Sequence, residues 1–151
     1  MYTLPTAQEG ELLQYDTYSG GVITSTLGIA YARYNFATDG GAVSTITPAQ
    51  NTTIPADAIL LSGVINVTTA VTSSGSATVA IGVSGGSATN TLMAATAKAS
   101  LTADLATPTA TTFAAPKKIT TAGSITVTIA TAALTAGVIE IWVMYVIAAT
   151  S

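Results

Sequence analysis

The chain has 151 residues, a formal net charge of −3 and a charged content of only 7%, and it contains no histidine and no cysteine. Histidine is the commonest general base and metal ligand near neutral pH, and cysteine supplies thiolate nucleophiles, disulfides and many zinc ligands. Their absence excludes Ser-His-Asp and Cys-His catalysis, disulfides and most transition-metal sites, so we expect neither an enzyme nor a bound cofactor or metal.

The first twenty residues differ in composition from the rest of the chain. Met1–Gly20 holds three of the seven acidic residues and three of the six tyrosines, and it shows no hydrophobic period. Tyrosine suits a docking segment because it buries area while its hydroxyl keeps a hydrogen-bonding tip. We therefore predict an N-terminal arm over residues 1–20 and a single domain over residues 21–151, with Tyr2, Tyr15 and Tyr18 as interface residues. An ordinary first strand with a frayed end is the alternative interpretation.

Short β-prone runs separated by turn residues follow this segment. Val22–Leu27 and Ile29–Phe36 are two such runs. The Asp39-Gly40 pair is a strong hairpin signal because both positions accept positive φ. We expect a hairpin here that joins Tyr34–Ala37 to a strand over Val43–Ile46.

The clearest strand signal is the alternation over Ile59–Val71. Its odd-numbered positions are mostly apolar and its even-numbered positions are more polar, which predicts one face in a core and the other outward. Because the run exceeds the usual strand length, we expect a bend or bulge at Gly63. The turn at Ser73–Ser76 leads into Val79–Val83, and the spacing predicts that these two strands are adjacent and antiparallel.

Later residues give one helical signal and further strand signals. Thr91–Leu105 lacks Gly and Pro and contains Leu, Met, Ala and Lys, which favour a short helix. Ile125–Ile129 alternates between large aliphatic residues and threonine, which favours a strand. Several short strands joined by Gly and Ser turns predict an all-β fold. We expect an antiparallel, jelly-roll-like β-sandwich with an extended N-terminal arm and room for one short helix.

The last predicted strand, Val138–Ile147, is apolar on both faces except for Glu140. Such a strand is central in a sandwich or has one face in a subunit contact. Trp142 lies two residues further on and is expected on the same face as Glu140. We predict that both are interface residues that point toward a neighbouring subunit. Pairing of Glu140 with a lysine is the alternative.

The weaker motifs are better explained without catalysis or ligand binding. Gly82–Gly86 matches the G-x-S-x-G nucleophile elbow, but without a histidine base we interpret it as a plain turn. The acids are too scattered to favour a glycosidase pair or a calcium site, and the four cations form no basic stripe for nucleic acid. Five aromatic residues after the arm are favoured as core or interface anchors over a sugar-binding platform: Tyr31, Tyr34, Phe36, Trp142 and Tyr145.

A series of segments also carries a family resemblance. In chain order these are Thr53–Leu60, the long Val/Thr strand and its Ser/Gly turn, Val79–Val83, Leu92–Ala95, Gly123–Ile129 and Gly137–Tyr145. Together they resemble small capsid decoration (cement) or head-associated proteins of tailed bacteriophages over roughly Ile54–Val146, with Asp57 where glycine would be expected. The resemblance implies a β-sandwich, often trimeric, that sits on the outer capsid lattice and bridges neighbouring capsomers.

Composition and resemblance together predict a non-enzymatic structural protein of a phage virion, made in the host cytoplasm and located on the capsid exterior. A charged content of 7%, against roughly 25% in a typical protein, indicates a surface that partners cover. The expected partners are further copies of the chain, with a trimer favoured, and a major capsid protein. Nucleic acid is not expected, nor is a membrane, since no apolar run reaches the ~20 residues of a spanning helix. The alternatives are another virion component (fibre base, tail or shell subunit) and a carbohydrate-binding or adhesin module, whose partner would be a glycan.

Overall fold

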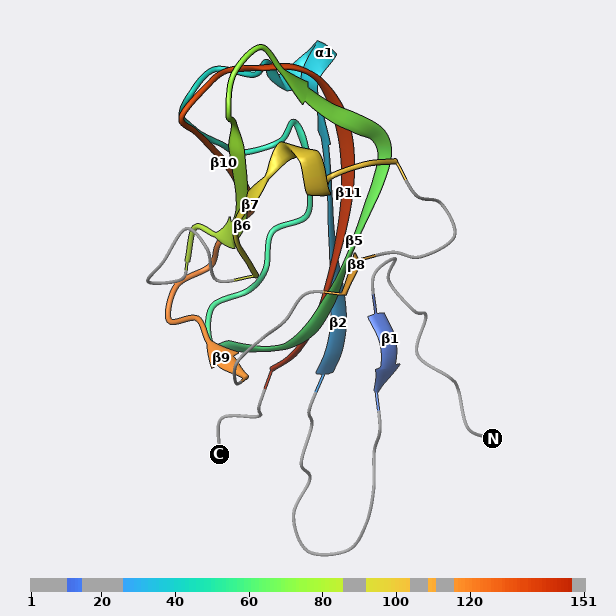
Figure 1. Cartoon of the computed structure of the whole chain (residues 1–151). Coiled ribbons are helices and arrows are strands. Elements are labelled where there is room, and N and C mark those ends of the chain that lie inside the picture. Colours follow the sequence, from blue (N-terminus) through green and yellow to red (C-terminus); the bar gives the residue numbers. More distant parts are fainter. Residues whose placement is uncertain (1–10, 15–25, 86–91, 104–108, 111–115, 148–151) are drawn as a thin grey trace, which may run out of the picture.

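The chain folds into two antiparallel β-sheets, which form the two layers seen in Figure 1. The computed structural model describes residues 11–14, 26–85, 92–103, 109–110 and 116–147. In these residues the larger sheet contains β1 (Glu11–Gln14), β2 (Thr26–Asn35), β4 (Gln50–Asn51), β5 (Ala58–Ser73), β8 (Thr109–Ala110), β9 (Lys117–Lys118) and β11 (Leu134–Ile147). The smaller sheet contains β3 (Thr45–Ile46), β6 (Thr78–Val83), β7 (Met93–Ala97) and β10 (Ile125–Ala130).

The larger sheet has the strand order β1-β2-β11-β5-β8, with β4 also paired to β2 and β9 to β5. The smaller sheet has the order β3-β10-β6-β7. The connections from β2 to β3, from β5 to β6 and from β10 to β11 each cross from one sheet to the other. The predicted all-β antiparallel sandwich is therefore confirmed, and its finer, jelly-roll-like topology stays a prediction.

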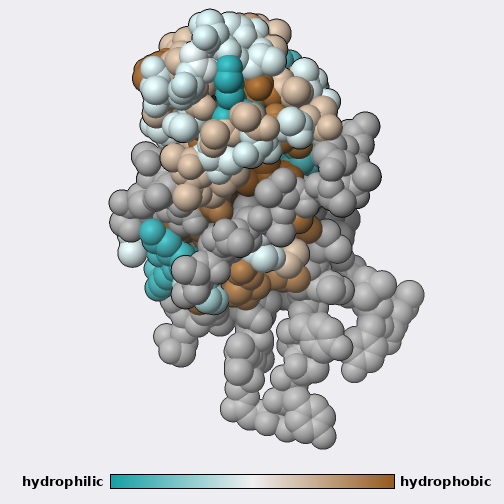
Figure 2. Space-filling view, in the orientation of Figure 1, coloured by the Kyte–Doolittle hydropathy of each residue, from teal (hydrophilic) through white to brown (hydrophobic). Residues whose placement is uncertain are grey.

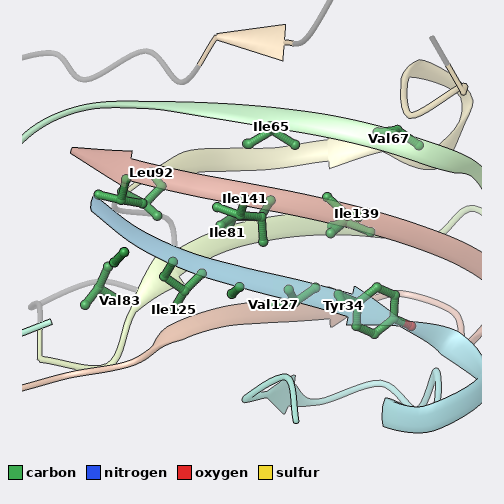
Figure 3. Packing of buried hydrophobic residues seen from close by; sticks show 14 of the residues in the cluster. Tyr34, Ile65, Val67, Ile81, Val83, Leu92, Ile125, Val127, Ile139 and Ile141 are labelled. Carbon is green, nitrogen blue, oxygen red and sulfur yellow. The ribbon is translucent and has the colours of Figure 1, made fainter. Parts of the chain in front are cut away.

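The space between the sheets is filled by alternate side chains of the facing strands, as Figure 3 shows. β11 contributes Ile139, Ile141 and Val143, and β10 contributes Ile125 and Val127, all of them fully buried. The alternation arises because successive residues of a strand point to opposite faces of a sheet. Burial of one such aliphatic side chain stabilises the fold by about 1.5–3 kcal/mol. The two rows of aliphatic residues are thus the main source of stability of the sandwich.

β5 changes the face that it buries part-way along its length. Where it pairs with β11, it carries one extra residue, Leu61, between the paired positions Leu60 and Ser62. A β-bulge of this kind shifts the alternation by one residue. Leu60 and Ile65 are consequently both buried, whereas Leu61 is exposed. The irregularity expected at Gly63 is present two residues earlier, and the predicted inward, odd-numbered face is right at Ile65 and wrong at Leu61.

Two predicted pairings are wrong. β6 does not pair with β5 but with β10 and β7 in the other sheet. β2 and β3 also lie in different sheets, and between them Phe36–Asp39 forms a one-turn helix, α1, in place of a hairpin at Asp39-Gly40. The Asp39 carboxylate accepts hydrogen bonds from the N–H groups of Asn35 at 2.8 Å and Ala49 at 2.9 Å, which holds the chain in a corner. Each strand has an apolar face, and placing successive strands on opposite sides of one core buries both faces.

Met93–Ala97 forms β7 instead of the short helix predicted over Thr91–Leu105, and Lys98–Ser100 adds one 3₁₀ turn. Pairing with β6 satisfies the backbone of β7. Differences in helix propensity are at most about 0.7 kcal/mol per ordinary residue, so tertiary pairing overrides them. Leu92 and Leu101, on either side of β7 and the 3₁₀ turn, are buried and fix the segment to the core.

Part of the predicted N-terminal arm is described. Glu11–Gln14 forms β1, which pairs antiparallel with β2 near Gly28. The remainder of the arm, with Tyr2, Tyr15 and Tyr18, lies outside the described residues. Docking by the arm, and the division of the chain at residue 20, therefore stay predictions.

The backbone at Gly123 lies directly against two other segments, at Ile54 and at Gly85. Gly123 exchanges two hydrogen bonds with Ile54, of 2.7 and 3.0 Å. A Cβ atom on Gly123 would lie 2.3 Å from the nitrogen of Gly85. In the same turn as Gly85, the Ser84 hydroxyl accepts a hydrogen bond from the N–H of Ser124 at 2.8 Å. The serine of the G-x-S-x-G motif thus lies in a turn and has a structural hydrogen bond.

We expect Gly123→Ala to lower the free energy of unfolding by about 1–3 kcal/mol, the usual cost of overpacking. The new Cβ would meet backbone atoms of Gly85, which cannot swing aside as a side chain can. Thr121→Ala, at an exposed neighbour, is the matched control and should stay within about 0.5 kcal/mol of wild type. Urea unfolding followed by tryptophan fluorescence measures both. Equal stabilities of the two variants would show that the turns can separate without cost.

Candidate interaction surface

Strands β2, β11 and β5 lie side by side in the larger sheet (Figure 1). Alternate side chains of these strands point away from the core. The pairing register places Glu140 opposite Arg33 and Asn66, Trp142 opposite Tyr31 and Val64, and Met144 opposite Ile29 and Ser62. We call this side of the larger sheet the outer face. Its members are Leu27, Ile29, Tyr31 and Arg33 on β2, Glu140, Trp142, Met144 and Val146 on β11, and Ile59, Leu61, Ser62, Val64 and Asn66 on β5.

Exposed large hydrophobic side chains are concentrated on the outer face. Ile29 is 36% exposed, Leu61 and Val64 are each 38% exposed, and Met144 is 40% exposed. The one other exposed large hydrophobic residue among those described is Val43, at 55%, between α1 and β3. Single exposed apolar residues are common on protein surfaces, but a group of them on adjacent strands indicates an interaction site.

Trp142 and Tyr31 form an aromatic pair near the centre of the outer face. Their ring centroids are 5.4 Å apart and their planes are inclined by 45°. This separation lies within the range in which aromatic pairs attract each other. Because the two rings are tilted, they do not form one flat platform of the kind on which a sugar ring stacks. Their geometry suits anchors in a protein contact.

Glu140 is the single charged residue of β11, and neighbours on both sides hold its carboxylate. Asn66 Nδ2 donates a hydrogen bond to Oε2 at 3.2 Å, and the Tyr31 hydroxyl donates to Oε1 at 3.4 Å. Arg33 Nε lies 3.9 Å from Oε1, with the two side chains 39% and 24% exposed. The partner is thus arginine rather than the lysine considered above. An ion pair this exposed contributes at most about 1 kcal/mol, and its main effect is to leave the outer face without net charge.

The Glu140 carboxylate also affects the pKa of Tyr31. Burial raises the pKa of the Tyr31 hydroxyl above its usual value of 10.0, and the Glu140 carboxylate raises it further through charge repulsion and as a hydrogen-bond acceptor. The Arg33 guanidinium opposes this shift. The Tyr31 hydroxyl therefore keeps its proton, and its hydrogen bond to Glu140, throughout the neutral range.

The sequence-predicted interface residues are only partly brought together. Glu140 and Trp142 share the outer face, as their spacing predicts. Tyr2, Tyr15 and Tyr18 lie outside the described residues. The sequence did not identify Ile29, Val64 or Met144 as members of this surface, because only the pairing register of three strands places them beside Trp142. Of the other aromatic residues, Tyr34 belongs to the core, and Phe36 and Tyr145 pack against it.

The carboxylates considered for catalysis or metal binding have structural partners where they are described. Asp57 pairs with Lys118 at 2.8 Å, Asp39 holds the corner at α1, and Glu140 pairs with Arg33. Asp104 lies outside the described residues. Within the described part of the chain, no three His, Cys, Asp or Glu residues gather to form a potential metal site. Nor does that part contain a helix with the length and hydropathy needed to cross a membrane.

The fold recurs in solved phage capsid structures. A chain of the cyanophage Pam1 capsid asymmetric unit matches with a TM-score of 0.59 at 15% identity, over 95% of this chain and 98% of that chain. A chain of the acidic stable capsid structure of Helicobacter pylori bacteriophage KHP30 matches with a TM-score of 0.55 at 13% identity, over 86% of this chain and 100% of that chain. No protein-family model matches the sequence, and the comparison with curated proteins gives no match. At these identities the likeness establishes a shared fold. Both matching chains come from phage capsids, the kind of particle that the sequence resemblance also indicates.

We expect Glu140→Gln to lower the pKa of Tyr31 toward its ordinary value, because the substitution removes a neighbouring negative charge. A titration of ¹³C-labelled tyrosine by NMR measures the shift, with Asp57→Asn as the control that leaves Tyr31 unchanged. Since the folded-state pKa of Tyr31 is raised, the stability linked to it is present below about pH 10 and is lost as the pH rises through the folded value. Glu140→Gln should therefore lose less of this stability at alkaline pH. An unchanged Tyr31 titration would show that Glu140 does not contact the hydroxyl in solution.

Proposed function

We propose that the chain is a capsid decoration, or cement, protein of a tailed bacteriophage, which binds the outer capsid lattice and stabilises the shell without catalysis. The observation that carries this proposal is the shared fold with chains of two phage capsid structures. Because the match covers 98% and 100% of those chains, they are sandwiches of about this size rather than larger proteins that contain one. A small sandwich suits a subunit that is added to a shell.

The surface supports a passive mechanism. Most of the described surface in the space-filling view is pale or brown, and strongly hydrophilic colour is confined to small patches (Figure 2). Burial of apolar area provides roughly 25 cal/mol per Å², less the cost of ordering the partners. Repetition of the same weak contact around a lattice multiplies its strength through avidity. Added contact area alone would then hold capsomers together against internal pressure.

The proposed partners are a major capsid protein and further copies of the chain, with a trimer as the favoured oligomer, on the capsid exterior. We assign to the N-terminal arm, with Tyr2, Tyr15 and Tyr18, a contact with the capsid or with a partner subunit. β1 supports this assignment because it joins the arm to the edge of the larger sheet, from which an extended segment can reach a neighbouring protein.

Two other functions are weaker. Another virion role, as a fibre base, tail component or shell subunit, is compatible with the shared fold but requires a different copy number. A carbohydrate-binding or adhesin module would need an exposed aromatic platform. The tilt between Tyr31 and Trp142 disfavours a flat platform at that pair.

Particles purified from the native source test the proposal. We expect hundreds of copies of this chain per particle, quantified by mass spectrometry against the major shell protein, and expect mild treatment to remove them without breaking the shell. A handful of copies would identify a tail or vertex component instead. Near-zero recovery in sedimented particles would discard a virion role and make binding on a glycan array the next measurement.

Deletion of Met1–Gly20 is expected to abolish binding to particles stripped of the protein while leaving the sandwich folded, since the core strands lie after the arm. A shorter deletion, of Met1–Gly10, removes Tyr2 but keeps β1, Tyr15 and Tyr18, so it separates the contribution of the first ten residues from that of the rest of the arm. Particle occupancy by sedimentation and the cooperativity of unfolding are measured for both. Full occupancy by the longer deletion would exclude the arm as the capsid contact.

A further inference from the structure

The two sheets differ in the chemistry of the sides that they turn away from the core. On β10 of the smaller sheet the outward positions are Thr126, Thr128 and Ala130, and the paired positions of β6 are Gly82, Ala80 and Thr78. On the larger sheet the corresponding side is the outer face, with Trp142, Met144, Val64 and their apolar neighbours. The positions turned away from the core are therefore small on the smaller sheet, where Thr126 and Ala80 are themselves buried, and include large exposed apolar side chains on the larger sheet.

The outer face is apolar and electrically neutral. Its described members include two charged residues, Arg33 and Glu140, and these pair with each other. The domain as a whole is also neutral. Three of the seven acidic residues lie in Met1–Gly20, which leaves four acids against the four cations in residues 21–151. A partner recognised by charge, such as an acidic or basic groove, finds no complementary charge on this face.

A second copy of the chain fits a face that is apolar and carries no net charge. It presents a neutral β-sheet face of the same kind, and two such faces pack about 10 Å apart with interdigitated side chains. Residues 21–151 of two copies approach each other without the repulsion that a net charge would cause, because the net charge of −3 lies in Met1–Gly20. The part of the sheet that carries the outer face is three strands wide and four outward side chains long. Its flat area is roughly 400 Å², without the extra surface of the projecting side chains. This is about half of the ~800 Å² per partner that a standard stable interface buries.

From this geometry we propose that the outer face is the surface through which copies of this chain associate, with Trp142 at the centre of the contact. The limited footprint makes the association depend on concentration in solution. The contact concerns the chain by itself, so it holds whether or not the protein also binds a capsid.

The chain offers a matched pair of variants. Val64→Lys places a charge beside Trp142 on the outer face, whereas Val43→Lys makes the same change at an exposed valine elsewhere. Both side chains are exposed, so both variants should unfold at the wild-type denaturant concentration. Met144→Lys, also on the outer face, is a second variant in case Val64→Lys is unstable.

Sedimentation of the full chain over a range of concentrations measures association. We expect wild type and Val43→Lys to reach a multiple of 15.0 kDa, and Val64→Lys to associate at least about tenfold more weakly, because a lysine charge would have to be desolvated in the contact. Trp142 is the single tryptophan of the chain, so its fluorescence should shift to shorter wavelength as the wild type associates and should not shift in Val64→Lys. A wild type that stays at 15.0 kDa at every concentration, or a Val64→Lys variant that associates as wild type does, would overturn the proposal.

These outcomes are independent of the proposed capsid function. A chain that associates through the outer face but is absent from particles would contradict only the decoration role. A chain that is abundant on particles but monomeric in solution would contradict this inference and the proposed trimer, but not the decoration role.

Discussion

The position of β11 between β2 and β5 is the constraint on which the rest of the structure depends. β11 pairs with β2 from Val138 to Ile147 without a break in register, and it pairs with β5 on its other edge. Because the side-chain period of a strand is two, this one strand supplies Ile139 and Ile141 to the core and Glu140 and Trp142 to the outer face. A slip of one residue would exchange these sets. The register of β11 therefore determines the core and the candidate interface together.

Glu140 makes that register costly to change. In the native register its carboxylate lies opposite Arg33 on one neighbouring strand and Asn66 on the other, within reach of both and partly in contact with solvent. In a slipped register the carboxylate would enter an aliphatic core, where an unpaired charge costs several kcal/mol. The native ion pair adds little stability by itself. Its contribution is specificity, because it penalises the alternative arrangement far more than it favours the native one.

The alternation of apolar and polar residues in the sequence predicted several of the strands. The strand character of Ile59–Val71, Ile125–Ile129 and Val138–Ile147, and the common face of Glu140 and Trp142, follow from the period of a strand alone. The sequence did not show which strands would pair, because that depends on contacts across the core. The expected hairpin at Asp39-Gly40 failed for this reason.

The candidate site shows the same limit. The Tyr31–Glu140 hydrogen bond joins residues 109 positions apart in the sequence, and no spacing rule connects them. The helix predicted over Thr91–Leu105 failed because pairing of β7 with β6 outweighed helix propensity. What the sequence lacked was the order of the strands, and with that order the members of the outer face follow directly.

The composition of the outer face suits contact with a binding partner. Its side chains stand on three paired strands, so its backbone loses little conformational freedom when a partner binds. Its two charges are already paired, so covering them separates no ion from its partner, and the carboxylate keeps its bonds from Asn66 and Tyr31. Binding still costs the removal of water from the exposed parts of Arg33 and Glu140, whereas the removal of water from the apolar side chains around them is favourable. The central strand, β11, provides this surface with the same alternation that builds the core.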